Sequence, residues 1–229
     1  MENVNCLHLV NVDKKNLSNE NGLTDTKSNG FQFIQRKLHE GYDTIDLRQN
    51  YSLLVLPNYF AYKGVKDERN WSVDIRTWAH LAHENKVLLI TDFEDCTSFN
   101  ELIERLEKSN VQDTDADLSS VVMTCTYLLG RRKSDIADEY EDLYIPSSAA
   151  LAGKMANTAK TKISQGVAGQ QYGCLNGGMT VRFNLLKSEL SLLIDKGVVP
   201  MIEVDGRVIA FSNSTLYDGP IQGLQEYPI

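Results

Sequence analysis

Three carboxylates stand close together just after a short apolar run, at Asp92, Glu94 and Asp95. Open parallel sheets bind their ligands beyond the carboxyl ends of the strands, where carboxylates can exchange protons with a substrate or hold a divalent metal. Asp95 also lies just before an expected helix, whose positive end favours a negative charge. The sequence supplies no phosphate-binding loop beside these residues, so a structural role for the carboxylates is favoured over a ligand or metal site. A small-ligand or metal-dependent α/β enzyme using the three carboxylates is the alternative.

A second group with metal-binding residue types is His80, His83 and Glu84. On a helix the spacing i, i+3, i+4 puts the three side chains on one face, and two imidazoles with a carboxylate can hold zinc. The order of the residues is neither His-Glu-x-x-His nor His-x-x-Glu-His, so a metalloprotease mechanism is not indicated. Polar residues near the end of a helix are usually exposed to solvent, and we predict no metal site here.

Two further patterns for cofactor binding and catalysis are incomplete. Gly166–Gly173 is rich in glycine, but it lacks the Gly-x-Gly-x-x-Gly spacing and a preceding apolar strand, so we expect a flexible loop and no cofactor. A nucleophile elbow needs glycine two residues away on either side of its serine, where Ser147 has Ile145 and Ala149. Ser147 and Ser148 are instead expected at the start of a helix, where serine caps the backbone.

The helix that follows these serines is built almost wholly from small residues. Small side chains spaced i, i+3, i+4 and i+7 share one face of a helix and let another backbone approach closely. We therefore predict a packing or assembly role rather than chemistry for this stretch. Its candidate residues are Pro146, Ser147, Ala149, Ala152, Gly153 and Ala156.

Composition excludes several classes of partner. The 229-residue chain carries a net charge of -8, and its one basic cluster, Arg131–Lys133, is followed by acidic residues, so nucleic acid is not an expected partner. No apolar run approaches the ~20 residues that span a bilayer, so no membrane segment is expected. The four cysteines are far apart and are predicted to be free thiols in a reducing, cytoplasmic setting.

Hydrophobic periodicity predicts the elements that position these residues. Strands alternate with helices, which favours a mainly parallel, mixed sheet flanked by helices, and Asp205-Gly206 predicts a closing two-residue β-hairpin. The polar stretch 1–27 is expected to be an N-terminal arm or linker, and 28–229 the α/β domain. We predict strands over 51–56, 87–90, 120–127, 198–204 and 207–211, and helices over 30–40, 72–84, 98–108 and 184–196, besides the small-residue helix.

Capping residues and apolar positions support four details of these helices. Ser72 is expected to cap the helix 72–84, and Ser98 with Glu101 to form a capping box. Asn184 is expected to begin the helix 184–196 and Gly197 to end it. The predicted inward residues are Ile75, Trp78, Ala79 and Ala82 in the first of these helices and Leu186, Leu190, Leu193 and Ile194 in the last.

Several ordered blocks of the sequence resemble contractile tail sheath proteins, a family of phage tail sheaths that includes the large sheath subunit of type VI secretion systems. The stretch IPSSAALAGKMANT (145–158) resembles the proline, serine and small-residue signature of that family. Residues 182–202 are similar to its helix, glycine and strand, and 206–216 to the next strand and its Thr215-Leu216 end. VLLITDFEDCTSFNELIERL (87–106) looks most like the Bacteroidetes-type subunit. The resemblance covers about 51–226.

The resemblance implies a structural protein with no enzymatic activity and no cofactor. Such a subunit pairs with a small sheath subunit, stacks in a helix with copies of itself around an inner tube protein, and contracts to drive effector delivery. An AAA+ ATPase commonly disassembles the contracted form. The glycine-rich loop and the small-residue helix are expected in the packing core, and Gly197, Gly206, Thr215 and Leu216 join the candidate packing residues.

Two departures from the family pattern leave alternatives open. Family members are longer at the N-terminus, and they continue beyond the position of Ile229 into a strand and arm that link neighbours by strand addition. The sequence is therefore expected to be either a truncated subunit or a shorter, sheath-like relative such as a cap or baseplate protein. In a truncated chain the 206–211 edge is expected to be unpaired. A module that docks an extended peptide at the terminal hairpin is a third possibility.

Overall fold

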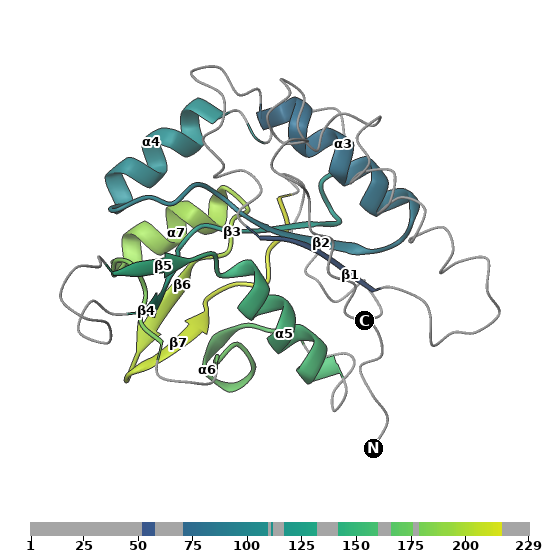
Figure 1. Ribbon diagram of the computed structural model, residues 1–229. Coiled ribbons are helices and arrows are strands. Elements are labelled where there is room, and N and C mark those ends of the chain that lie inside the picture. The colour runs from purple at the N-terminus through teal and green to yellow at the C-terminus, as the bar shows by residue number, and fades with distance from the viewer. Residues whose placement is uncertain are drawn as a thin grey trace.

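The computed structural model describes residues 52–57, 71–109, 111, 117–131, 142–159, 166–175 and 179–216 (Figure 1). The expected arm (1–27) and helix (30–40) lie outside these residues. The described strands are β1 (Leu53–Leu56), β2 (Leu88–Asp92), β3 (Val121–Thr124), β4 (Leu128–Arg131), β5 (Leu143–Ile145), β6 (Met201–Val204) and β7 (Arg207–Ala210). The described helices are α3 (Trp71–Glu84), α4 (Phe99–Ser109), α5 (Ser148–Ala159), α6 (Gly169–Tyr172) and α7 (Lys187–Asp195).

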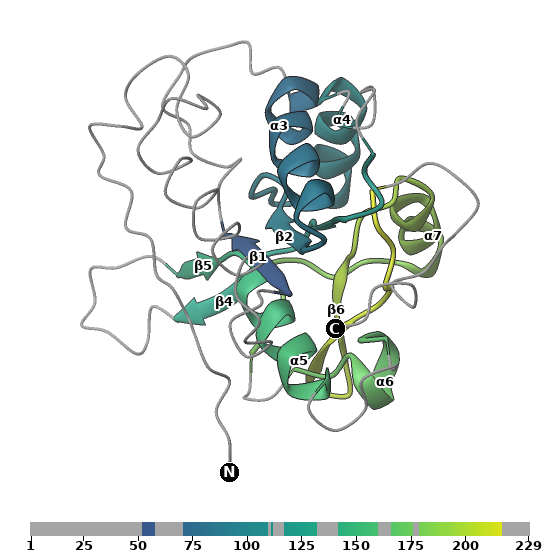
Figure 2. The same ribbon diagram turned by 90° about the vertical axis from the view of Figure 1, so that its right-hand side faces the viewer.

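A parallel sheet in the order β1-β2-β3 forms the centre of the fold. Figures 1 and 2 both place α3 and α4 on one side of this sheet and α5 on the other. Alternate residues of β2 enter two different cores: Leu89 packs with α3 and α4, whereas Leu88 and Ile90 pack with α5. Burial on both faces explains the unbroken apolar sequence of β2 and confirms the predicted α/β class.

The sheet continues beyond β3 into the C-terminal part of the chain. Val199 donates its N–H to the Met123 carbonyl (2.8 Å) and accepts the N–H of Cys125 (3.2 Å). From there β6 and β7 form the predicted antiparallel hairpin, with Val204 opposite Arg207. Its two turn residues have positive φ angles, 51° at Asp205 and 71° at Gly206, as a type I′ turn requires.

The strand predicted over 120–127 is shorter than expected. β3 ends at Thr124, and a separate strand, β4, begins at Leu128 and pairs antiparallel with β5. Between the two strands the backbone bonds to later parts of the chain: the N–H of Cys125 bonds to the Val199 carbonyl, and the Tyr127 carbonyl accepts the N–H of Arg182 (2.8 Å). The sequence 120–127 gave no sign of this break, since all of it is buried.

Helix starts depart from the expectations more than helix interiors do. Ser72 lies within α3 rather than at its cap. At α4 the Ser98 hydroxyl accepts the Glu101 N–H (3.3 Å) as predicted, but the Glu101 carboxylate reaches back to the N–H of Thr97 (2.8 Å). In α7 the Glu189 carboxylate accepts the N–H of Leu186, which is the capping residue in place of Asn184. Within the helices the predictions hold better: the four predicted inward residues of α3 are all buried, namely Ile75, Trp78, Ala79 and Ala82.

The start of α7 also changes which of its leucines are buried. Leu190 and Leu193 are in the core as predicted, and Ile194 is half-buried. Leu186, in contrast, is 68% exposed. A leucine at the capping position precedes the first helical turn, so it does not share the inward stripe. Its predicted burial was therefore wrong.

Gly197 terminates α7, as predicted. Gly197 has a φ of 70°, its N–H bonds to the Ile194 carbonyl (2.8 Å), and the Val198 N–H bonds to the Leu193 carbonyl (3.3 Å), which is a Schellman motif. α3 ends with the same two bonds, but Lys86, with a φ of 52°, occupies the position where α7 has glycine. No helix within the described ranges is long and apolar enough to cross a membrane.

Candidate functional site

The Asp92 carboxylate is fully buried at the end of β2 and holds the first turn of α5. Its Oδ1 accepts the backbone N–H of Ser148 (2.8 Å) and the hydroxyl of Thr124 (2.6 Å), while its Oδ2 accepts the hydroxyl of Ser148. A negative charge at the first N–H groups of a helix is stabilised by the helix dipole and satisfies a backbone donor that the helix itself leaves free. Asp92 therefore joins β2, β3 and α5.

Glu94 and Asp95 point to partners on other elements. Glu94 pairs with Arg105 of α4, and this hydrogen bond is the main cause that raises the pKa of the Arg105 guanidinium. Arg105 also donates to Glu101 (2.6 Å). Asp95 Oδ1 lies 3.0 Å from Nε of Arg182, an ion pair in which the N–H is not directed at the oxygen. The expected interaction of Asp95 with the start of α4 stays a prediction beside this pair.

Arg182 is a residue that the sequence analysis did not single out. Its guanidinium stacks 4.0 Å from the ring centre of Tyr144 in β5, and its backbone N–H bonds to Tyr127. A cation over an aromatic face adds to the ion pair with Asp95. Arg182 thus joins the β4–β5 pair to the main sheet, and no local spacing relates it to Asp95 or Tyr144.

The two histidines and the glutamate of α3 that have metal-binding residue types do not form a ligand set. His80 Nε2 lies 3.1 Å from Glu84, whereas His83 Nδ1 lies 3.3 Å from Asp117 on a different segment, and all of these side chains are well exposed. No group of three histidine, cysteine, aspartate or glutamate residues within the described ranges is arranged to hold a metal. The carboxylates of Asp92, Glu94 and Asp95 likewise bind three different partners rather than one centre.

Nucleophilic groups near this edge of the sheet are buried. Burial raises the pKa of the Cys96 thiol to about 12 and that of the Cys125 thiol to about 12. Burial, followed by the negative charge of Asp92, raises the pKa of the Tyr127 hydroxyl as well. Cys96, Cys125 and Cys174 are free thiols, as predicted; Cys6 lies outside the described residues.

The two serines before α5 also have structural places. Ser148 is the first residue of α5 and bonds to Asp92, and the carbonyl of Ser147 accepts the N–H of Leu151 (2.9 Å). Both serines are buried and Pro146 is half-buried, so neither hydroxyl presents a nucleophile to solvent. The predicted placement at a helix start is correct.

The small-residue stripe of α5 points largely away from the described core. The buried face of α5 consists of Ser148, Leu151, Ala152, Met155 and Thr158. Ala149 and Gly153 are exposed, and a Cβ placed on Gly153 would have no atom within 4 Å. Ala156 is half-buried. A close approach of another backbone to this stripe would have to come from outside the described ranges, and that role stays a prediction.

The glycine-rich stretch is ordered where it was expected to be a flexible loop. Residues 169–172 form α6, and the following three residues pair with the outer edge of β7. A Cβ on Gly173 would stand 2.7 Å from the Ala210 carbonyl oxygen, so only glycine fits this approach without a shift. The 206–211 edge, expected to be unpaired in a truncated chain, is therefore covered by the chain itself.

The remaining candidate packing residues lie around the same C-terminal elements. Gly197 and Gly206 have the left-handed conformations described above. Thr215 and Leu216 are buried, and the N–H of Leu216 bonds to the carbonyl of Val121 (2.9 Å) at the start of β3. Both ends of β3 thus receive backbone bonds from the C-terminal part of the chain.

The fold and the hydrogen bonds together define the class of the protein. It is an α/β domain in which polar residues at the strand ends connect different secondary-structure elements. A family described as type VI secretion system TssC/VipB, central domain, matches residues 1–218, and the chain belongs to this family. The match extends the resemblance from about residue 51 to residue 1.

Two solved structures are similar to parts of the chain. The anti-feeding prophage helical sheath in the contracted state shares 16% identity, with a TM-score of 0.49 over 82% of this chain and 46% of that chain. The anti-feeding prophage baseplate, 6-fold symmetrised, shares 17% identity, with a TM-score of 0.45 over 80% of this chain and 42% of that chain. The chain thus spans less than half the length of either. No curated protein matches the chain.

Proposed function

We propose that this chain is a structural subunit of a contractile sheath: the large subunit of a type VI secretion system, or a shorter relative of it. The observation that carries the proposal is the family match over residues 1–218. The bonding of Asp92, Glu94 and Asp95 supports it, because each carboxylate is used to join elements of the fold. No observation among the described residues favours the alternative enzyme.

The partners follow from this proposal. The chain would pair with a small sheath subunit in the cytoplasm, stack with further copies in a helix, and enclose an inner tube. An AAA+ ATPase would disassemble the contracted form. These partners are those of the family, and the assembly face has to be sought on the chain itself.

The exposed stripe of α5 is our candidate for that face. Ala149 and Gly153 are exposed on a helix whose opposite side is anchored in the core by Leu151 and Met155, so the helix is rigidly held while its small residues face outward. Small residues let a neighbouring subunit approach the helix backbone closely, which suits a densely packed assembly.

Co-expression of the chain with the small sheath subunit, followed by purification through a tag on that partner and negative-stain electron microscopy, tests the function. Tubes or cogwheel-shaped rings are expected. A soluble pair without tubes would keep the family relation but exclude this chain as a self-sufficient sheath subunit. A chain that does not co-purify would refute the sheath proposal.

A pair of leucine substitutions tests the assembly face in the same experiment. Gly153→Leu adds a large side chain where nothing lies within 4 Å, so the fold should survive while close approach is blocked. Ser191→Leu is the matched control, because Ser191 is also exposed, on α7, and its hydroxyl bonds to the Lys187 carbonyl of the same helix. Tubes that form equally well with both variants would exclude the stripe from the assembly contact.

A further inference from the structure

The outer edge of β7 is covered by three residues of the same chain, Gly173–Leu175, which we call the edge cover. The N–H of Leu175 bonds to the Val208 carbonyl (2.8 Å), and the N–H of Ala210 bonds to the Gly173 carbonyl (3.0 Å). Cys174 lies opposite Ile209 between these two bonds. The edge cover is therefore an antiparallel strand of minimal length.

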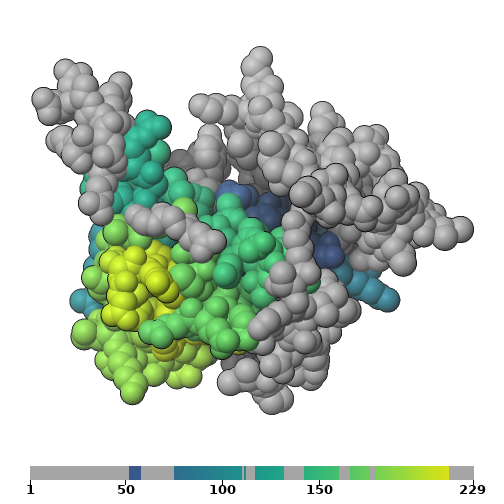
Figure 3. Space-filling model, turned by 90° about the horizontal axis from the view of Figure 1, so that it is seen from below, coloured from purple at the N-terminus to yellow at the C-terminus, as the bar shows by residue number. Residues whose placement is uncertain are grey.

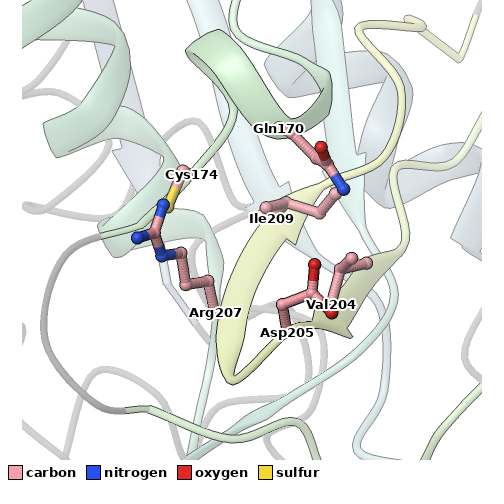
Figure 4. Close-up of a pocket in the computed structure, with 6 residues that line it drawn as sticks. All are labelled: Gln170, Cys174, Val204, Asp205, Arg207 and Ile209. Atoms are coloured by element: carbon pink, nitrogen blue, oxygen red, sulfur yellow. The ribbon is translucent and has the colours of Figure 1, made fainter.

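The edge cover pairs with β7 over fewer residues than β6 does on the other side. Two backbone hydrogen bonds join the described residues of the edge cover to β7. A hollow of about 240 Å³ lies beside it. Figure 4 shows its lining side chains between α6 and the hairpin. Side chains from both sides line it, namely Gln170 and Cys174, and Val204, Asp205, Arg207 and Ile209. Beside this hollow Cys174 is only half-buried, whereas Gly173 and Leu175 on either side of it are buried.

β7, the strand with which the edge cover pairs, would be able to pair with another chain if its edge were exposed. Val208, Ile209 and Ala210 are all buried, and none carries a charge that would oppose pairing with another strand. Figure 3 shows the hairpin, in yellow, on the same face of the molecule as the green atoms of α5 and α6. An apolar edge strand with free backbone groups on this face would pair with another chain.

We propose that the edge cover prevents β7 from pairing with β7 of a second copy of this chain, and that its release opens β7 for a two-fold symmetric, antiparallel pairing of two copies. This inference concerns an association of the chain with itself and does not depend on the sheath function.

The register of such a pairing favours a second copy as the partner. The outward backbone groups of β7 belong to Val208 and Ala210, which bond the edge cover. An antiparallel pairing about Ile209 would put Val208 of one copy opposite Ala210 of the other, with the same contacts on both sides of the axis, as a two-fold interface requires. Arg207 would fall opposite Phe211, a cation against an aromatic ring, so no like charges face each other.

A reversible disulfide tests the proposal in the full chain. Cys174 and Ile209 form a non-hydrogen-bonded antiparallel pair, whose Cβ atoms lie about 4.5–5.5 Å apart, close to the separation that a disulfide needs. The variant Ile209→Cys, in a Cys6→Ser background, can therefore join the edge cover to β7 when oxidised. The oxidised and reduced forms have the same sequence and serve as controls for each other.

Association would be measured by analytical ultracentrifugation after gentle warming below the unfolding midpoint. The reduced form should dimerise with rising concentration, the oxidised form should stay monomeric, and a reductant should restore the dimer. Equal association of the two forms, or none in either, would overturn the proposal.

A matched pair of alanine substitutions tests release of the edge cover without oxidation. Gly173→Ala adds a methyl group 2.7 Å from the Ala210 oxygen, whereas Gly153→Ala adds the same group where nothing is within 4 Å. Gly173→Ala should speed hydrogen exchange at the Leu175 and Ala210 amides but not in β2. If opening rises about tenfold, the apparent dissociation constant of the dimer should fall by about a hundredfold, because both copies must be open. A Gly173→Ala protein with protected amides and unchanged association would contradict the proposal; if it does not fold, the disulfide comparison decides.

Discussion

Replacement of Asp92 gives the most direct measure of how the strand ends stabilise the fold. Asp92→Ala removes the carboxylate that accepts three hydrogen bonds, which come from the Ser148 N–H, the Ser148 hydroxyl and the Thr124 hydroxyl. A buried donor without a partner costs about 1–3 kcal/mol, and loss of a helix cap costs about 1 kcal/mol. Because these costs overlap at Ser148, we expect a loss of about 3–5 kcal/mol in the free energy of unfolding.

Asp92→Asn separates the charge from the shape. Asparagine keeps the size of the side chain and one acceptor oxygen, and its amide can donate to the Ser148 hydroxyl, but it brings no negative charge to the start of α5. The remaining loss should be about 1–2 kcal/mol, from the weaker bonds and the lost interaction with the helix dipole.

Urea unfolding at pH 7, followed by far-ultraviolet circular dichroism, measures both variants through their midpoints and slopes. Glu203→Gln is the control, because Glu203 is exposed on β6 and its change should stay within about 0.5 kcal/mol. The reasoning would be refuted if Asp92→Ala were within about 1 kcal/mol of the unchanged protein, or if asparagine cost as much as alanine.

Three further predictions follow from single residues. Arg182→Lys should lower the free energy of unfolding by about 1–2 kcal/mol, because lysine lacks the planar guanidinium that stacks on Tyr144 while it pairs with Asp95; an unchanged urea midpoint would argue against this contact. Lys86→Gly should raise it by about 0.5–1 kcal/mol, since glycine adopts the φ of 52° without strain, and a lower melting temperature would be inconsistent with the helix end described. At pH 8 a maleimide should modify half-buried Cys174 well before Cys96, whose burial raises the thiol pKa to about 12; mass spectrometry showing equal rates would disprove that burial.

The parallel sheet could be predicted from the sequence because its signals are local. The apolar run of β2 and the period of α3 each lie within one stretch of chain, and two strands separated by a helix favour a parallel pairing. The hairpin turn at Asp205-Gly206 and the end of α7 at Gly197 were predictable for the same reason, since each depends on one residue with a positive φ.

The side-chain contacts between different secondary-structure elements could not be predicted, because each involves residues that are far apart in the chain. Asp92 and Ser148 are separated by 56 positions, so neither the strand-end carboxylate nor the serine indicated the other. The inward and outward faces of α5 were ambiguous too, because a small residue carries little information about burial: Ala152 is buried and Ala149 is exposed. At Leu186 a leucine at helical spacing was assigned to the core although the helix begins after it.

The long-range cap of α5 has a consequence for the order in which the chain folds. α5 has no acidic residue in its own first turn, and a 12-residue helix is marginal in water without tertiary support. Closing a loop of 56 residues costs roughly 3.5 kcal/mol of chain entropy, which is about as large as the whole loss expected when the Asp92 carboxylate is removed. α5 should therefore form late and together with the paired ends of β2 and β3, as part of one cooperative unit rather than as a helix that nucleates by itself.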